Sequence, residues 1–404
     1  MFATEGYDMT VTRFQTLQGT TSRYWVLVAV AALASVAGLR ASHYMETAGH
    51  WVTGMSNQVV WGMPHVFAVF LIVAASGALN TASIASVFDQ AEYKPLARLS
   101  GLLAIALLLG GLAVLVLDLG RPDRLTVAMT SYNFKSIFAW NIFLYTGFLA
   151  VVAIYLWLMF EPRMNRFIRS VGTFALAWRL VLTTATGSIF GFLVAREAFD
   201  SAIMAPMFIL MSLSFGTALM LIVCLLMFCI NGTDMGEERI QGLRRLLGYF
   251  VIAVLYVVAV DHLTKLYVTG HHALERFILV DGGVYTLLFW GVQIALGGLL
   301  PAALLLLPRF TGRRYLVIAA VLVLVGGLAQ LYVIIIGGQA FPLNVFPGYT
   351  ASSSFFDGAV AAYVPSLPEV TLGIGGLGLA LLLTLLALRV LPFLPAGNRR
   401  ATSS

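Results

Sequence analysis

The stretch that decides the fold runs from Val59 to Val87 and reads VVWGMPHVFAVFLIVAASGALNTASIASV. It is longer than the ~20 apolar residues that a helix needs to cross the hydrocarbon core of a membrane. Its only ionisable side chain is His65. Because lipid offers no hydrogen bonds to an open backbone, a run of this kind predicts a membrane-spanning helix and not a strand.

Nine further apolar runs of similar length follow the same pattern along the chain. The predicted spans are 24–41, 59–87, 100–118, 137–160, 171–195, 203–230, 244–269, 284–307, 315–337 and 370–394. The sequence therefore predicts an all-α integral membrane protein, with a ten-span domain at 24–394 between an N-terminal segment, 1–23, and a tail, 395–404. Spans two to five and six to nine start on the same side, which permits two four-helix bundles with two flanking helices.

The composition excludes several classes of protein. Hydrophobic residues make up 60% of the chain and charged residues 10%, whereas soluble domains contain roughly 25% charged residues. A soluble protein, a disordered chain and a nucleic-acid binder are therefore excluded, in spite of the net charge of +6. Segment 1–23 is polar and lacks the apolar core of a removable signal peptide, so we expect none.

Lysine and arginine are distributed unequally between the two ends of the predicted spans. Of the 24, sixteen lie in or beside the N-terminus, the even-numbered loops and the C-terminus, and six in or beside the odd-numbered loops. Because basic residues accumulate on the cytoplasmic side, we expect both termini in the cytoplasm and the odd loops outside a bacterial inner membrane. The odd loop 338–369, rich in glycine, proline and aromatic residues, is expected to be a lid or docking surface.

Ionisable side chains gather at one depth, near the outer ends of four spans. Such groups are costly inside a membrane and commonly mark a functional site. They are His65, Asp118, Arg121, Glu197, Asp200, Asp261 and His262. Each also has a purely structural interpretation. Asp118 could pair with Arg121, and Asp261 with Lys265 four residues later on the same helix. Glu197 and Asp200 could be solvated loop residues, and His65 could pack between helices. Their shared depth favours a site.

The chemistry that fits this level is that of a quinone. A quinone ring presents two carbonyls, takes up two protons with two electrons, and binds among aromatic side chains such as Trp61, Tyr132 and Trp140. A histidine facing an aspartate can hold a carbonyl and exchange its proton near neutral pH. Arg179 enters from the cytoplasmic side and is a candidate for a proton route, although helix packing also explains it. Asp261, His262, Glu197 and Asp200 are candidates for a second relay in the other bundle.

Resident metal centres are not expected in this chain. Cys224 and Cys229 are five residues apart in one apolar run, point in different directions on a helix, and hold neither an iron–sulfur cluster nor zinc. Only His65 and His262 among the six histidines fall within spans, too few for the four axial ligands of a two-haem cytochrome. We therefore expect no metal site, iron–sulfur cluster or pair of haems in this chain, while a single haem stays open on these residues.

Several motifs resemble one known family. Asp118-Leu119-Gly120-Arg121-Pro122 follows a span, and 130–136, which reads TSYNFKS, precedes an aromatic span with Trp140. This order is similar to the NrfD/polysulfide-reductase membrane anchors, and Trp61-Gly62-Met63-Pro64 resembles the ten-span HybB/DsrP-like branch. The resemblance covers nearly the whole chain.

The resemblance implies a haem-free subunit that exchanges electrons with menaquinone or ubiquinone. It further implies a ferredoxin-like iron–sulfur subunit on the periplasmic face, and beyond it a molybdopterin or other catalytic subunit. The implied quinone-site residues are Trp61, His65, Asp118, Arg121, Tyr132, Ser136 and Trp140, with catalytic roles for His65, Asp118 and Arg121. Sulfur-compound metabolism is the expected context, and a [NiFe]-hydrogenase or alternative-complex-III type of anchor, a secondary transporter and a passive anchor stay open.

Overall fold

The computed structural model describes residues 14–18, 22–343 and 358–396. Most of segments 1–23 and 395–404, and the centre of the loop 338–369, lie outside these described residues. Ten helices in the described part are long and apolar enough to cross a membrane, which confirms the predicted all-α, ten-span class. The chain is a multi-pass integral membrane protein.

The ten spans differ in regularity, because several contain breaks or wider π-helical turns. They are α1 (Ser22–Ala48), α2 and α3 (Met63–Ala78, Asn80–Ser86), α4 (Lys94–Leu117), α6 (Ile137–Phe160), α7 (Ile168–Gly191), α8 (Met204–Asn231), α9 (Glu237–Tyr267), α11, η7 and α12 (Val284–Leu287, Leu288–Leu299, Leu300–Leu306), α13, η8 and α14 (Arg313–Tyr332, Val333–Gly337, Gly338–Ala340), and α15 (Leu367–Val390). Segments η7 and η8 are the π-helical ones within the spans.

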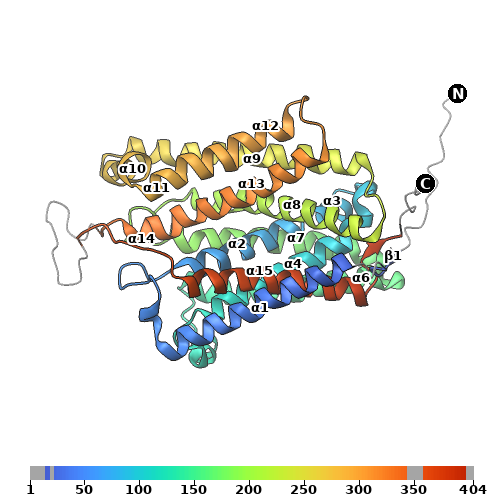
Figure 1. Cartoon of the computed structure of the whole chain (residues 1–404), viewed down its shortest axis with the longest axis horizontal. Coiled ribbons are helices and arrows are strands. Elements are labelled where there is room, and N and C mark those ends of the chain that lie inside the picture. The colour runs from blue at the N-terminus through green and yellow to red at the C-terminus, as the bar shows by residue number, and fades with distance from the viewer. Residues whose placement is uncertain (1–13, 19–21, 344–357, 397–404) are drawn as a thin grey trace.

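Short elements connect the spans. They are η1 (His50–Val52), η2 (Ala91–Tyr93), η3 (Pro122–Arg124), α5 (Leu125–Thr130), η4 (Pro162–Phe167), η5 (Thr269–His271), α10 (His272–Arg276) and the π-helical η6 (Phe277–Asp281). Two strands of two residues, β1 (Phe14–Gln15) and β2 (Leu394–Pro395), pair antiparallel. They join the two ends of the chain at one end of the molecule (Figure 1). The opposite end, with α14 and the start of α2, is called the distal end below.

Neighbouring spans contact one another in two groups. Helices α2, α4, α6 and α7 contact in sequence, and α7 closes the group against α2 and α3. Helices α8, α9, α12, η7 and α13 form a second group, in which α13 returns to α8. Helix α1 lies on α15, which packs on α4 and α2 (Figure 1). Two four-helix bundles with two flanking helices stay a prediction that these contacts support.

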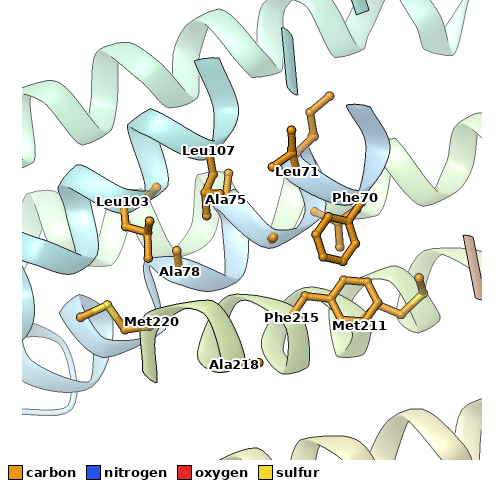
Figure 2. Close-up of a cluster of buried hydrophobic side chains, with 14 of the residues drawn as sticks. Phe70, Leu71, Ala75, Ala78, Leu103, Leu107, Met211, Phe215, Ala218 and Met220 are labelled. Atoms are coloured by element: carbon orange, nitrogen blue, oxygen red, sulfur yellow. The ribbon is translucent and has the colours of Figure 1, made fainter. Parts of the chain in front are cut away.

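Helix α2 lies at the centre of the molecule. Its most apolar window is 94% buried, the highest share among the ten spans of the described residues. Figure 2 shows why: Phe70 meets Phe215 of α8 on one side, while Leu71 and Ala75 face Leu107 of α4. Helix α2 is apolar on all sides, and in this central position it has neighbours on all sides.

Span two is broken at Leu79, where the sequence predicts one uninterrupted run. The hydroxyl of Ser100 in α4 donates to the carbonyl of Ala78 at 2.7 Å and accepts from the amide of Ala82 at 3.1 Å. A side chain from another helix thus takes the place of the backbone bond from residue 82 to residue 78. Inserting a side chain into the hydrogen-bond ladder is an established cause of a helix kink.

Glycine pairs set the closest helix crossings. A Cβ on Gly77 of α2 would fall on the backbone of Ser212 in α8, and one on Gly216 would fall on the backbone of Gly77. Gly297 and Gly326 approach each other in the same way between η7 and α13. Small residues at membrane-helix interfaces let the backbones approach closely. The resulting van der Waals contacts stabilise the helix pair, since in lipid there is no hydrophobic driving force between helices.

Candidate functional site

An aromatic cluster with a histidine forms where α2 begins. Trp61 and His65 are four residues apart, and their rings stack with centroids 5.2 Å apart and planes 10° from parallel. Phe138, Phe190 and Phe199 surround Trp61 at centroid distances of 6.1, 5.8 and 6.2 Å. The cluster thus joins α2, α6, the end of α7 and the segment that follows α7.

The His65 ring is partly accessible, and its nitrogens are able to form hydrogen bonds with a ligand. It is half-buried, and among the described residues neither ring nitrogen has a hydrogen-bond partner. A neutral imidazole offers one donor and one acceptor. His65 can therefore bind a carbonyl or hydroxyl of a ligand without breaking any bond shown within the protein.

Asp118 lies on the α15 side of α4, where it ends the helix. The ring Nε2 of His50 is 3.2 Å from the Asp118 carbonyl oxygen. Carboxylate atom Oδ1 is buried without a hydrogen-bond partner among the described residues. Burial, reinforced by the Glu369 carboxylate, raises the pKa of Asp118 to about 7. The carboxyl group therefore exchanges its proton in the neutral range.

Glu369, the third residue of α15, is a site residue that the sequence analysis missed. Its side chain is fully buried, and Oε2 accepts from the amides of Gly54 at 2.8 Å and Ser366 at 2.7 Å. Its Oε1 accepts from the Tyr363 hydroxyl at 2.7 Å. The Tyr363 hydroxyl oxygen in turn accepts from the Met63 amide at 2.7 Å. The spacing of Ser366 and Glu369 before an apolar run is a capping-box signal that could have indicated it.

Burial, followed by the contact with Glu369, raises the pKa of Tyr363 well above its usual value. Tyr363 therefore remains a hydroxyl and holds the first turn of α2 against α15. The acidic residues and the His65 cluster lie on different sides of the start of α2, and no hydrogen bond or ion pair between His65 and Asp118 occurs among the described residues.

Arg121 does not pair with Asp118, which corrects the expected contact. Its guanidinium instead binds Asp123 through two bonds of 3.0 and 2.8 Å, and both side chains are exposed. The hydrogen bond from Arg121 lowers the pKa of Asp123. The spacing of two residues across Pro122 suits the planar guanidinium, whereas the Asp118 carboxylate faces inward.

The residues expected from the start of span four divide between two clusters. Tyr132 packs on Phe143, with ring centroids 4.4 Å apart, and Trp140 donates to the Phe134 carbonyl. Ser136 precedes α6 and bonds Asn133 through its backbone amide. Of this segment, Phe138 is the residue whose ring meets Trp61. The structure thus joins Trp61 and His65, and places Tyr132 and Trp140 in a separate, more exposed cluster.

A buried cation lies farther along the same group of helices. Arg179 is 5% exposed and donates to the carbonyl of Ser76 at 3.1 Å and to the side chain of Asn80. Its Nε is buried without a partner in the described part of the chain. The hydroxyls of Ser76 and Thr183 are 2.6 Å apart beside it. Polar groups therefore follow α7 from Arg179 toward the distal end.

A second polar cluster occurs at the distal end of the other helix group. Asp261 and Lys265 form a buried ion pair of 2.8 Å, and Ser201 donates to Asp261 at 2.8 Å. Nδ1 of His262 lies 2.7 Å from Oε2 of the fully buried Glu275. A cavity of about 30 Å³ borders Asp261, His262 and Lys265. This volume is enough for one or two water molecules.

Two other predicted residues lie beside this cluster. Glu197 is half-buried and has a partner, while Asp200 is exposed. The backbone amide of Asp200 bonds the Arg196 carbonyl at 3.2 Å. Both residues belong to the turns between α7 and α8, next to Ser201. Among the described residues no group of three or more histidine, cysteine, aspartate or glutamate side chains is arranged to hold a metal ion.

The pKa of Asp118 predicts a specific pH dependence of stability. Folded Asp118 keeps its proton up to about pH 7, whereas an unfolded aspartate loses it near pH 4. The unfolding free energy therefore falls as pH rises from about 4 to about 7, and it is level above that range. Asp118→Asn cannot ionise, so we expect its melting temperature to exceed wild type at pH 8, by roughly 2–4 °C per kcal/mol, and to match it at pH 4.

Thermal unfolding of the detergent-purified protein at pH 4 and 8 measures this difference. Asp123→Asn is the control, because Asp123 is exposed and its pKa is lowered; it should show no gain at pH 8. An Asp118→Asn difference that is equal at both pH values would contradict the proton-linked interpretation.

Comparison with known proteins gives these residues a context. Residues 51–343 match the family described as Polysulphide reductase, NrfD. An Hdr-like menaquinol oxidoreductase integral membrane subunit of Archaeoglobus fulgidus is 28% identical over 387 residues, covering 95% of this chain and 96% of that protein. A putative dimethyl sulfoxide reductase membrane subunit of Halobacterium salinarum is 28% identical over 93% and 92% of the two sequences. A polysulfide reductase subunit of Wolinella succinogenes is 25% identical over 70% of this chain and 96% of its own length.

Proposed function

The chain belongs to the NrfD polysulphide reductase family, and we propose that it is the quinone-reactive membrane subunit of a respiratory oxidoreductase complex. One observation carries this proposal: the half-buried His65 ring stacks on Trp61 and has no hydrogen-bond partner among the described residues. The name of the Archaeoglobus fulgidus relative, a menaquinol oxidoreductase subunit, supports a quinol as the ligand.

The site would exchange protons as the quinone exchanges electrons. When a quinol becomes a quinone it loses two electrons and two protons. One proton would pass to His65, and the other would leave by way of Asp118, which lies on the other side of the start of α2 and whose pKa of about 7 lets it accept and release a proton near neutral pH. In this proposal Trp61 orients the quinol ring, while Arg121 is held by Asp123 at the surface. Quinone reduction uses the same groups in reverse.

Electrons would leave to a partner subunit. We propose a ferredoxin-like iron–sulfur subunit at the distal end, facing the periplasm, and a molybdopterin or other catalytic subunit beyond it. The lysine and arginine distribution supports an orientation with both termini in the cytoplasm. The names of the polysulfide and dimethyl sulfoxide reductase relatives support a sulfur compound as the substrate of the whole complex.

The proposal includes a proton route through the membrane. Arg179 and the adjacent hydroxyls would provide its inner portion. Asp261 and His262 border a cavity with room for water, and Glu197 and Asp200 lie beside it. Groups of this kind within a span commonly mark proton relays.

The central test compares two histidine variants in the purified complex. We expect His65→Gln to lower quinol-dependent reduction of the partner's iron–sulfur centre by about 10²-fold or more, which is typical for loss of a proton-transfer group. His43→Gln is the matched control, because His43 is exposed on α1 and should leave the rate unchanged. Turnover by His65→Gln at the wild-type rate would overturn the site assignment.

Co-purification separates the alternative functions. A secondary transporter should purify without an iron–sulfur partner, and a passive anchor should bring its partner but retain no quinone. The proposed function requires both the partner and bound quinone in one preparation. Extraction of the purified complex with organic solvent, followed by chromatography, measures whether it contains bound quinone.

A further inference from the structure

The segment that carries Trp61 is held by a side chain from the other helix group. Gln339 of α14, at the end of span nine, is 1% exposed. Its Oε1 accepts from the amides of Val60 and Trp61, each at 3.0 Å. Its Nε2 donates to the Trp61 carbonyl at 3.0 Å and to the Ile335 carbonyl at 2.8 Å. All four hydrogen-bonding positions of the amide are therefore occupied.

Arg196 extends this connection. Its two terminal nitrogens donate to the carbonyls of Gln339 and Gln58, each at 2.9 Å. The Gln58 side chain donates in turn to the Ala359 carbonyl at 3.1 Å. The segment from Gln58 to Trp61 is thus fixed to span nine and to the turn after span five, although it has no regular secondary structure.

The π-helical turn before Gln339 contributes to this placement. Segment η8 ends at Gly337, two residues before Gln339, and π turns are frequent at functional sites. The bond from Gln339 to Ile335 returns along the same helix, so the side chain is fixed at its own backbone before it reaches Trp61. A side chain fixed in this way loses little further entropy when it holds a neighbour.

We propose that Gln339 is a positioning residue for the quinone site, and that it sets the position of Trp61 and, through ring stacking, of His65. This inference rests on the proposed function of His65. Gln339 touches the backbone of the Trp61 segment and not the reacting atoms. Loss of its amide would leave two N–H groups and one carbonyl at the start of the site without these partners, so the Trp61 ring would no longer be held in one place.

The test replaces Gln339 with methionine, which keeps the length of the side chain and removes its four hydrogen bonds. We expect Gln339→Met to raise the KM for a soluble quinol analogue about tenfold, with a smaller change in kcat. Hydrogen exchange of the Val60 and Trp61 amides should become faster. Gln330→Met is the matched control, since Gln330 is similarly buried in the same span and makes no bond to this segment; its KM should stay within about twofold of wild type.

A merely structural role would lower the yield or kcat of both variants without a specific change in KM. A Gln339→Met KM equal to that of Gln330→Met would overturn the proposal. If Gln339→Met does not assemble, Gln339→Glu retains both bonds accepted from Val60 and Trp61 and should show a smaller rise in KM; a wild-type KM there would also contradict the proposal. Loss of the proposed function itself is recognised separately, because His65→Gln would then turn over normally.

Discussion

Replacing Gly216 with alanine is expected to prevent the protein from accumulating in a folded form. A methyl group at this position would fall on the backbone of Gly77 in α2, so the two helices would have to separate. Overpacking a core commonly costs about 1–3 kcal/mol, and here the obstacle is backbone, which cannot rotate away. We expect a loss of at least about 3 kcal/mol, because α2 and α8 join the two helix groups.

The measurement is the monodisperse fraction in size-exclusion chromatography after detergent extraction. Gly291→Ala is the control: it lies in η7, and a Cβ there would meet only the end of the Leu287 side chain at 3.5 Å. That variant should be neutral or stabilised by up to about 1 kcal/mol, since alanine is the better helix former. Wild-type behaviour of Gly216→Ala would show that the crossing of α2 and α8 is wider than described.

Removing Lys265 alone is expected to destabilise the second helix group by about 3–5 kcal/mol. Lys265 and Asp261 are 7% and 4% exposed, and their ion pair is 2.8 Å long. In Lys265→Met the Asp261 carboxylate would remain buried with the Ser201 hydroxyl as its neighbour. An uncompensated buried charge costs far more than the net value of the pair.

The double variant Asp261→Asn/Lys265→Met should recover most of this loss, because it removes both charges and keeps a polar partner for Ser201. Lys94→Met is the control, since its pair with Asp89 is exposed and is worth about 1 kcal/mol or less. Thermal unfolding of the four proteins in one detergent gives the comparison. A double variant as unstable as Lys265→Met would indicate that packing around the side chain, and not charge, is responsible.

Particular residues show how far the sequence could predict the site. The motif around Trp61 and His65 places both at the predicted start of span two, and the structure stacks their rings. Trp61 precedes the first residue of α2 and is held there by Gln339, so the stacking does not follow from helical spacing alone. The expected contact of Arg121 with Asp118 was wrong, because a partner two residues away was available. Glu369 and Gln339 were missed, since they lie about 300 residues from the segments they hold.

The sequence by itself determined that the helices lie in a membrane and how many of them span it. Runs of about 20 apolar residues with few charges are stable as helices in lipid whatever their neighbours are, because each helix satisfies its own backbone. Tertiary structure alone decided which polar groups meet. The break at Leu79 requires the Ser100 hydroxyl of another helix, and the Trp61 segment requires Gln339 from the other helix group. Such contacts depend on helix crossings that are set by packing between small residues, and hydrophobicity along the sequence does not specify which helices pair.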